Sequence, residues 1–381
     1  MKKTILFYCQ HLLGIGHYVR SLALAKGLKN HKVFFVNGGV PIETIPVPSE
    51  ITFVQLPPIQ ADEQFQLLLT GDDETFLRGR AQKLQELYAA IQPDIIIIEL
   101  FPFGRKKFQF ELIPLLEANL RNAKRARVVS SLRDILVQKR DQAKFEERVC
   151  QLVNRYFDDV LVHADPKIHV LDSSFSRVGD LKANVHYTGY VVTQNGSAGK
   201  KADPHKRKSP FRITVSAGGG RVGLPLFETA VRSFPLLAAW RPVEMTLVTG
   251  PFLPPEQRHV LDALTEGCPG ISTETFVPNL TEVLRHSDVS VSMAGYNTCM
   301  DVLQARVRSV LVPFTGGGND EQWRRARALS EVGLATVLHP RKLAPENLRD
   351  AIVAAARSEL PGLQVDLAGV ERTNRLVSAM A

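Results

Sequence analysis

Short apolar runs alternate with longer amphipathic stretches along most of the chain. The segments TILFYC, KVFFVN and DIIIIEL are rich in β-branched and aromatic residues, as strands are. The four isoleucines from Ile95 to Ile98 predict a strand that is buried on both faces. Helical spacing recurs over residues 75–91, 224–239 and 256–265. Strands that alternate with helices in this way predict an α/β protein with parallel sheets.

The strand and helix pattern occurs twice, which predicts two domains. The first array has six or seven strands and ends near residue 195, and the second begins with FRITVSAGGG and covers residues 211–365. Residues 196–210 carry five Lys/Arg against one acid and form the expected basic linker. Residues 366–381 are expected to be a C-terminal helix, and crossing back to the N-terminal domain is one arrangement open to it. Two such domains would face each other across a cleft, a common place for a small ligand.

The composition narrows the class of protein. A hydrophobic fraction of 44% with 23% charged residues is ordinary for globular domains. The longest aliphatic run is far shorter than the ~20 residues of a membrane span, and the N-terminus is typical of a first strand rather than a signal peptide. Four cysteines without a CxxC pair favour reduced thiols and indicate neither a disulfide framework nor a zinc site. We therefore expect a cytoplasmic protein.

The net charge of +8 suggests an anionic partner. The linker accounts for part of the excess, and a solvated linker is its simplest interpretation. The remainder gathers in Arg105–Lys107 and Arg121–Arg127, close to several phenylalanines. These segments are candidates for contact with anionic lipid at the inner face of the membrane, or with an acidic substrate. No recognised nucleic-acid motif accompanies the charge, so we expect no nucleic-acid partner.

The most informative stretch is Asp288 to Gln322, which contains a strand, a glycine turn, a helix and a second strand that ends in three glycines. In an open α/β sheet this order brings the glycines and the helix N-terminus to the carboxyl edge, where nucleotides bind. A helix N-terminus and cradling glycines suit a phosphate. Asp301 could hydrogen-bond two ribose hydroxyls, or it could complete a capping box with Thr298. Asp320 could likewise cap the next helix, which leaves Gln322 for a donor sugar.

The first glycine turn, Gly14-Ile15-Gly16-His17, does not fit a dinucleotide site. The third glycine position holds Val19, and the second strand ends in Asn-Gly-Gly instead of an acid. No P-loop sequence occurs either. His17 at the start of the helix is a candidate general base, with packing or a carbonyl contact as the structural alternative.

Two further groups follow strands of the first array on the same edge. Glu99 ends the DIIIIEL strand, and Arg133-Asp134 follow ARVVSSL. A Glu99–Arg133 ion pair would be structural. The alternatives are recognition of an acceptor and orientation of His17 by a carboxylate.

Together these residues resemble the GT-B glycosyltransferases, in particular the family 28-like branch of the bacterial peptidoglycan N-acetylglucosaminyltransferase. The resemblance covers both domains and is strongest over residues 276–338. It implies two Rossmann-like doubly wound domains, the first for the acceptor and the second for a nucleotide-diphosphate sugar. The resemblance places His17 in the family's glycine-rich turn and implies donor contacts by Val277, Gly295, Thr298, Asp301 and Gln322. The candidate catalytic residues are His17 and Glu99, and the candidate acceptor-binding residues are Tyr18, Arg133 and Asp134. The candidate donor-binding residues are Gly16, Gly218, Gly219, Arg221, Phe276, Val277, Gly295, Asn297, Thr298, Asp301, Gly317, Gly318, Asp320, Glu321 and Gln322.

The sequence therefore predicts an inverting, metal-independent glycosyltransferase that takes its sugar from a nucleotide-diphosphate donor, with UDP-sugar the favoured choice. No cofactor is expected, the acceptor is open, and the protein is expected to be a monomer or homodimer. The sequence contains no Asp-x-Asp, in keeping with metal-independent chemistry. A nucleotide-sugar 2-epimerase and a nucleotide-binding protein without activity are the alternatives.

Overall fold

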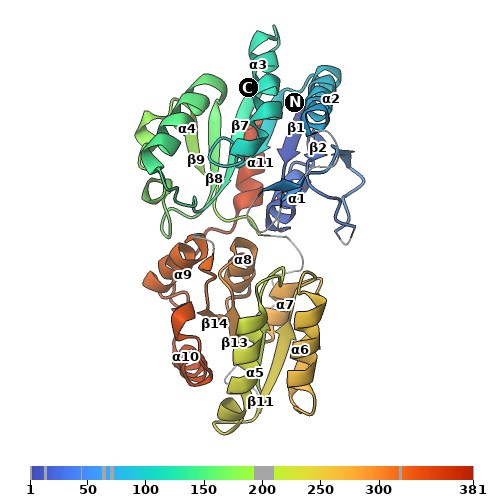
Figure 1. The fold of residues 1–381 in the computed structure, drawn as a ribbon. Coiled ribbons are helices and arrows are strands. Elements are labelled where there is room, and N and C mark those ends of the chain that lie inside the picture. Colours follow the sequence, from blue (N-terminus) through green and yellow to red (C-terminus); the bar gives the residue numbers. More distant parts are fainter. Residues whose placement is uncertain are drawn as a thin grey trace. The chain divides into compact units, whose positions relative to one another are not determined.

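The computed structural model describes residues 2–12, 15–43, 45–61, 66–68, 73–192, 210–316 and 320–380. It divides into two compact units (Figure 1). Unit 1 comprises Met1–Thr193 together with Asp366–Ala381, and unit 2 comprises Gln194–Val365. The predicted basic linker, residues 196–210, lies outside the described residues except for Pro210.

Unit 1 is built on a parallel sheet whose strand order is β3-β2-β1-β6-β7-β8-β9. Of the strands expected from the sequence, the buried isoleucine run is β6, next to the first strand of the chain. A short antiparallel pair, β4 and β5, lies apart from this sheet. The strands are β1 (Thr4–Cys9), β2 (Lys32–Asn37), β3 (Ile51–Gln55), β4 (Gln60–Ala61), β5 (Leu67–Leu68), β6 (Ile95–Glu99), β7 (Arg127–Arg133), β8 (Asp159–His163) and β9 (Asn184–Tyr187).

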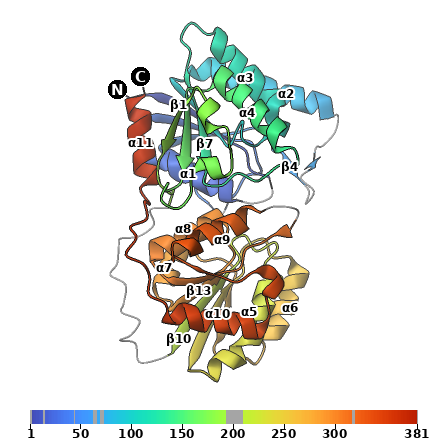
Figure 2. The same cartoon turned by 90° about the vertical axis from the view of Figure 1, so that its left-hand side faces the viewer.

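Helices cover both faces of this sheet, as Figure 2 shows from the side. The helices are α1 (Gly16–Gly27), α2 (Asp73–Ile91), α3 (Gln109–Arg121), α4 (Gln142–Tyr156) and α11 (Gly369–Ala379). The C-terminal helix α11 packs against α1, and its Val370 and Val377 join the apolar core formed by β1, β6 and α1. The C-terminal segment is therefore part of unit 1.

Unit 2 repeats the same plan with the strand order β12-β11-β10-β13-β14-β15, all parallel. Its strands are β10 (Phe211–Ser216), β11 (Val243–Val248), β12 (Ile271–Glu274), β13 (Val289–Ser292), β14 (Arg308–Leu311) and β15 (Thr336–Val337). Its helices are α5 (Leu224–Ala238), α6 (Pro255–Thr265), α7 (Leu280–Arg285), α8 (Tyr296–Ala305), α9 (Glu321–Glu331) and α10 (Pro345–Arg357).

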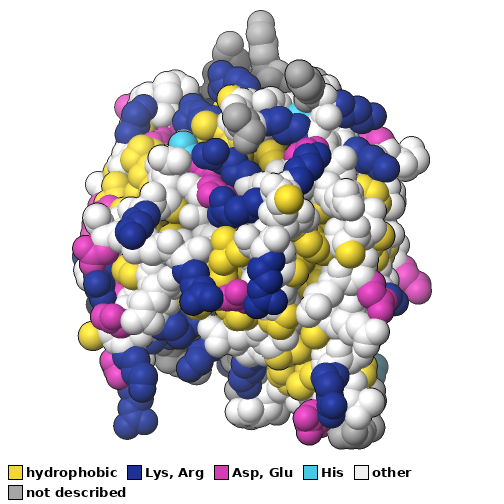
Figure 3. Space-filling model, turned by 90° about the horizontal axis from the view of Figure 1, so that it is seen from above, with side chains coloured by type: hydrophobic (Ala, Val, Ile, Leu, Met, Phe, Trp, Pro, Cys, Tyr) yellow, Lys and Arg dark blue, Asp and Glu magenta, His cyan; other side chains and the backbone are white. Residues whose placement is uncertain are grey.

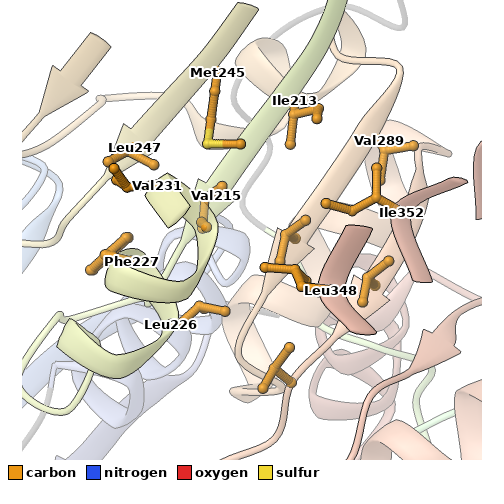
Figure 4. Packing of buried hydrophobic residues seen from close by; sticks show 14 of the residues in the cluster. Ile213, Val215, Leu226, Phe227, Val231, Met245, Leu247, Val289, Leu348 and Ile352 are labelled. Atoms are coloured by element: carbon orange, nitrogen blue, oxygen red, sulfur yellow. The ribbon is translucent and has the colours of Figure 1, made fainter. Parts of the chain in front are cut away.

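The main core of unit 2 lies on one face of its sheet (Figure 4). Val215 and Val289 point from the strands towards Phe227 of α5 and towards Leu348 and Ile352 of α10. The other side chains of β10 and β13 include buried serines, and a smaller apolar cluster joins α7 to α8. The more polar face of the sheet is therefore not the one that α5 and α10 cover.

Both sheets have the strand order of doubly wound nucleotide-binding folds, which reverses beside the first strand of each unit. The reversal falls between β1 and β6 in unit 1 and between β10 and β13 in unit 2. Loops that leave such a pair of strands diverge to opposite faces and leave a crevice at the carboxyl edge. The predicted site residues near His17 and Glu99, and those near Gly218 and Gly295, follow these strand pairs.

The basic, phenylalanine-rich stretch is only partly exposed. Phe101, Phe103 and Phe108 are buried in unit 1, whereas Phe110 is half-buried and Lys106 and Lys107 are exposed, so its contact with a membrane stays a prediction. The arginines at 125 and 127 are paired with the aspartates at 158 and 159. The face drawn in Figure 3 shows cationic, acidic and apolar side chains intermixed. Among the described residues, no helix is both long and apolar enough to cross a bilayer.

Candidate active site

The first group of site residues lies where α1 starts beside the end of β6. Nδ1 of His17 lies 2.6 Å from Oε1 of Glu99, and the carboxylate is completely buried. Arg20, one helical turn after His17, reaches the same Oε1. Residues three apart share one face of a helix, so α1 presents both side chains to the end of β6. This geometry matches one of the alternatives drawn from the sequence, in which a carboxylate orients His17.

Glu99 has a second cationic neighbour besides Arg20, which is Arg105 from the loop after β6. Its terminal nitrogen lies 3.4 Å from Oε2 of Glu99. Burial opposes the ionisation of Glu99, but His17, Arg105 and Arg20 together hold its pKa well below the ordinary value. The carboxylate is therefore ionised at neutral pH and accepts hydrogen bonds only.

Because Glu99 accepts, Nδ1 of His17 must donate. Burial lowers the pKa of His17, and Arg105 and Arg133 add to that effect against the opposing charge of Glu99. The imidazole is consequently neutral near pH 7, with its one proton on Nδ1 and a lone pair on Nε2. A neutral imidazole fixed in this tautomer by a carboxylate is suited to removing a proton from a hydroxyl.

A second buried histidine extends this cluster along the sheet edge. Nε2 of His163 lies 2.8 Å from the Ser131 hydroxyl, and Nδ1 lies 2.7 Å from the Thr188 hydroxyl. Burial, reinforced by Arg20, lowers the pKa of His163 to about 3. Both ring nitrogens are satisfied by neutral hydroxyls, so His163 is a neutral structural link between β7, β8 and the end of β9.

The predicted acceptor residues have different surroundings. Tyr18 is buried in the core, and its ring packs edge-on against Phe35 at 5.6 Å. One helical step after His17 turns this side chain by about 100° towards the sheet, and its contact with an acceptor stays a prediction. Asp134 is buried and accepts the N–H of Ile135 at 2.8 Å. Arg133 ends β7 and is half-buried.

In unit 2 the predicted phosphate site is the turn between β13 and α8. Gly295 is the N-cap residue of the helix, has an extended conformation and offers no side chain to cap it. Because Thr298 lies inside the helix and not at its N-cap, the alternative in which Thr298 and Asp301 form a capping box is wrong. The positive end of the helix dipole and the N–H groups of a first turn suit an anion.

The glycine loop after β10 reaches the same place. A Cβ on Gly218 would come 3.4 Å from the hydroxyl oxygen of Thr298, in the first turn of α8. Gly218 has φ = 61°, a left-handed conformation that glycine adopts without strain. Gly220 has a packing role instead, because a Cβ there would strike the carbonyl oxygen of Thr249 at 2.2 Å. Two of the predicted donor segments thus converge at the start of α8.

Asp301 lies farther along α8 and contacts the neighbouring helix. Its Oδ1 accepts the hydroxyl of Thr281 at 2.9 Å, and that hydroxyl also lies 3.3 Å from Oε1 of Gln304. Burial raises the pKa of Asp301 to about 6 despite the opposing Thr281 hydrogen bond. Thr281 was not identified from the sequence, because it lies 20 residues from Asp301 and on another helix.

Helix α9 supports the turn before α8. Oε1 of Gln322 accepts the N–H of Ala294 at 3.1 Å and that of Phe314 at 3.0 Å. A guanidinium nitrogen of Arg325 donates to the carbonyl of Ala294 at 2.9 Å, while a second nitrogen pairs with Glu321 at 2.6 Å. Gln322 therefore joins two loops through its oxygen, and its amide NH₂ makes no hydrogen bond within the described residues. Glu321 is buried in its pair with Arg325, and its contact with the donor stays a prediction.

The other predicted donor residues differ in burial and in the elements to which they belong. Asp320 precedes α9 without capping it, and its buried Oδ1 has no hydrogen-bond partner among the described residues. Phe276 is 49% exposed, and the neighbouring Val277 is half-buried. Arg221 is exposed and Asn297 is half-buried in the first turn of α8, while a Cβ on Gly219 would touch Phe252 at 3.2 Å. Gly16 begins α1 in unit 1. Gly317 and Gly318 lie outside the described residues.

Comparison with known proteins finds a family match for unit 2 and more distant relatives for longer parts of the chain. Residues 214–365 match the glycosyltransferase family 28 C-terminal domain. The chain is 27% identical over 201 residues to a UDP-N-acetylglucosamine–N-acetylmuramyl-(pentapeptide) pyrophosphoryl-undecaprenol N-acetylglucosamine transferase of Bacillus cereus, covering 52% of each chain. It is 35% identical over 86 residues to the transferase of the same name from Nitrosospira multiformis, which covers 23% of this chain and 24% of that one. The chain thus spans at most about half the length of these curated relatives.

Solved structures resemble the chain over almost its full length. MurG of Acinetobacter baumannii has a TM-score of 0.60 at 16% identity, covering 98% of this chain and 95% of that chain. The calicheamicin glycosyltransferase CalG4 has a TM-score of 0.62 at 17% identity, with coverages of 98% and 93%. A UDP-GlcNAc 2-epimerase of Methanocaldococcus jannaschii also has a TM-score of 0.62, at 9% identity, with coverages of 98% and 99%. At these identities the likeness concerns the fold.

The two units and their sheet order therefore define a protein of GT-B architecture, which confirms the predicted fold class. Within that class the chain resembles the family 28 glycosyltransferases, as its sequence predicted, and residues 214–365 carry the family's C-terminal domain.

Proposed function

We propose that this protein is a glycosyltransferase that transfers a sugar from a nucleoside-diphosphate donor, with UDP-sugar the favoured donor, to an acceptor hydroxyl. The observation that carries the proposal is the His17–Glu99 pair at the strand reversal of unit 1. A fold that only bound nucleotide would have no need to bury a carboxylate that fixes one tautomer of a histidine. The relatives named above supply the choice of UDP.

The proposal assigns the donor to unit 2. The β and α phosphates lie at the N-terminus of α8 and the Gly218–Gly219 loop, the ribose hydroxyls donate to Asp301, and Phe276-Val277 contact the base. The amide NH₂ of Gln322 donates to a sugar hydroxyl. The glycine at the N-terminus of α8, the Asp301 carboxylate on the same helix and the orientation of the Gln322 amide support these roles.

In the proposed reaction, Nε2 of His17 accepts the proton of the acceptor hydroxyl while its oxygen bonds to the anomeric carbon. The bond from that carbon to the diphosphate breaks, and the diphosphate leaves with its electron pair. A single displacement from the opposite face inverts the anomeric configuration. The α8 N-terminus and the loop N–H groups stabilise the charge of the leaving diphosphate, so the reaction proceeds without a divalent metal.

The first experiment is a thermal-shift titration of the full chain with UDP, GDP, dTDP, ADP and NAD in EDTA. We expect UDP to raise the melting temperature most. The matching UDP-sugar is then incubated with the protein and candidate acceptors, and the products are identified by NMR. Transfer with an inverted anomeric proton supports the proposal. Stabilisation by NAD alone, or by none of the nucleotides, contradicts it.

Product analysis also separates the alternatives. A 2-epimerase, whose fold is shared with the archaeal enzyme above, converts the UDP-sugar without an acceptor and yields an isomerised sugar. A binding protein leaves the UDP-sugar unchanged over long incubation. Transfer that requires both the acceptor and His17 excludes both alternatives.

A further inference from the structure

A pocket lies at the edge of unit 2, away from the strand reversal. Strand β15 ends the sheet on that side, and α9 packs against it. The chain then continues into the short 3-10 helix η6 (Pro340–Lys342). Side chains from α9, β15 and η6 line a cavity of about 440 Å³. This volume lies within the range of roughly 300–1,000 Å³ that small-molecule sites occupy.

The pocket offers an aromatic and aliphatic surface to a ligand. Val337 and Leu338 of β15 supply the aliphatic part. Trp323 of α9 and His339 pack edge to face with their ring centroids 4.9 Å apart, which is a favourable geometry for two aromatic rings. Both rings are half-buried. Each ring therefore helps to hold the other in place while part of its surface lines the pocket.

His339 also has a defined hydrogen-bonding role. Its Nδ1 accepts the N–H of Arg341 at 3.1 Å. A ring nitrogen that accepts a hydrogen bond carries no proton, so the ring proton of His339 lies on Nε2. This Nε2–H makes no hydrogen bond within the described residues, and it is a donor for a ligand in the pocket.

The charged side chains that line the pocket are two cations, Arg327 and Lys342, and one carboxylate, Glu331. Arg327 contacts Glu331 at 2.9 Å, but the two side chains are 60% and 64% exposed, so water weakens their pair. Lys342 is exposed, and its ammonium group makes no ion pair or hydrogen bond with the part of the chain that the structure describes. The pocket therefore favours an anion, and guanidinium and ammonium groups both bind carboxylate and phosphate oxygens.

This pocket is separate from the turn to which the proposed function assigns the donor. Gln322 and Arg325 of α9 hold the turn before α8. Arg325 and Arg327 are two residues apart, so their side chains leave the helix in directions about 200° apart. The helix therefore supports the turn with one face and lines the pocket with another.

We propose that the pocket binds a small molecule in which a planar ring carries an oxyanion. The ring lies against Trp323 and His339. The carboxylate or phosphate group contacts Lys342, Arg327 and the Nε2–H of His339. The site does not depend on the function proposed above, because none of these contacts involves His17 or the turn before α8.

Tryptophan fluorescence tests the site directly. The chain has two tryptophans, and the other one, Trp240, packs against Phe211 of β10. In the full chain with Trp240→Phe, tryptophan emission therefore comes from Trp323 alone. This protein is titrated with benzoate and with phenyl phosphate at constant ionic strength. We expect a saturable change of emission with a millimolar dissociation constant. Saturation by benzoate alone indicates a carboxylate ligand, and saturation by phenyl phosphate alone indicates a phosphate ester.

Matched probes test the two parts of the ligand separately. Acetate and inorganic phosphate lack the ring, and benzyl alcohol lacks the charge. We expect each of them to bind at least about tenfold more weakly than the better aromatic anion. Saturating UDP should leave the titration curve unchanged, because the turn before α8 is not part of the pocket.

Substitutions in the Trp240→Phe protein then test the cations. Arg327→Gln combined with Lys342→Gln should weaken binding at least about tenfold, because it removes both positive charges. Arg78→Gln is the matched control, since Arg78 also belongs to an exposed i,i+4 pair, with Glu74, but lies on α2 of unit 1. If the doubly substituted protein fails to fold by circular dichroism, Lys342→Gln alone carries the test, with a several-fold loss of affinity expected.

Four results would overturn the site. The first is an unsaturable change of emission with both aromatic anions, and the second is equal binding of the probes that lack the ring or the charge. The third is equal affinity of the control and the folded variant that lacks the cations. The fourth is competition by UDP, which would assign the signal to the turn before α8.

Discussion

The two units share the same strand order, but different types of side chain lie at the strand reversal of each unit. In unit 1 the end of β6 carries a buried carboxylate surrounded by a histidine and arginines. In unit 2 the end of β13 leads to a glycine, the N-terminus of α8 and one carboxylate paired with a hydroxyl. The pKa of Glu99 is lowered, whereas burial raises that of Asp301 to about 6. The same fold therefore stabilises the ionised form of Glu99 in unit 1 and the protonated form of Asp301 in unit 2.

Under the proposed function, this difference divides the tasks between the units. Unit 1 would hold a proton acceptor in a fixed tautomer, oriented by the ionised Glu99. Unit 2 would offer backbone N–H groups and a helix dipole to a diphosphate, and its Asp301 would gain partners when ribose hydroxyls bind. A site that is destabilising when empty and satisfied when occupied is typical of ligand binding.

The largest expected effect comes from removing the base. His17→Gln should lower kcat by roughly 10²–10⁴ and leave the UDP dissociation constant unchanged, because His17 lies in unit 1. Steady-state kinetics and calorimetry on the same preparation measure the two quantities. Turnover equal to that of the wild type would remove His17 from the chemistry.

Replacing the two carboxylates should change stability in opposite directions. Glu99→Gln leaves Arg20 and Arg105 without their counter-charge and should lower the free energy of unfolding by about 3–5 kcal/mol, the usual cost of breaking a buried pair. Asp301→Asn removes a poorly solvated charge and should be neutral or stabilising at pH 8. Urea titrations of both variants measure this difference in the free energy of unfolding. Destabilisation by both substitutions would contradict the predicted difference.

The raised pKa of Asp301 should also make the free energy of unfolding depend on pH. Its pKa is raised in the folded state to about 6 from an ordinary value of 3.8. The folded protein therefore favours the protonated form, and this stabilisation is present below pH 4 and is lost as the pH rises through 6. The loss amounts to at most about 3 kcal/mol. Comparing urea unfolding of the wild type and Asp301→Asn from pH 4 to pH 8 isolates it, and parallel curves would contradict the shift.

Asp301→Asn should weaken the binding free energy of UDP by about 1.5–3 kcal/mol, which is the scale of hydrogen bonds to a charged group. Asp262→Asn, an exposed change on α6, is the control and should bind UDP normally. An unaltered dissociation constant in Asp301→Asn would show that the ribose does not contact this carboxylate.

The smallest expected effect is the pH dependence of UDP affinity. Ribose hydroxyls donate to the ionised carboxylate, so affinity should fall by about tenfold between pH 7.5 and pH 5 as Asp301 is protonated. The Asp301→Asn variant should show no such fall. Calorimetry at several pH values tests this, and a fall of equal size in the variant would assign it to another group.

Much of the fold was predictable from local patterns. The isoleucine run of β6 and the alternation of strands with helices indicated two parallel sheets. Short edge elements such as β4 and β15 were not expected, because two residues provide no periodic signal. The burial of Phe101, Phe103 and Phe108 could not be read from composition, because composition does not reveal which side of a loop faces the core.

The site was predictable only where its residues directly follow strands. His17, Glu99 and the α8 turn do so and can be placed at the carboxyl edge by the order of elements. Arg20 contacts Glu99 across 79 residues and Thr281 contacts Asp301 across 20, so neither partner has a local signature. The spacing of three between His17 and Arg20 was the available signal, since it puts both side chains on one helical face.

One measurement tests the division of tasks most directly: calorimetric titration of UDP, in EDTA, into the wild type, His17→Gln and Asp301→Asn at pH 7.5. The account predicts equal affinities for the wild type and His17→Gln and a roughly tenfold or greater loss in Asp301→Asn. Absence of UDP binding in the wild type, or equal losses in both variants, would contradict it.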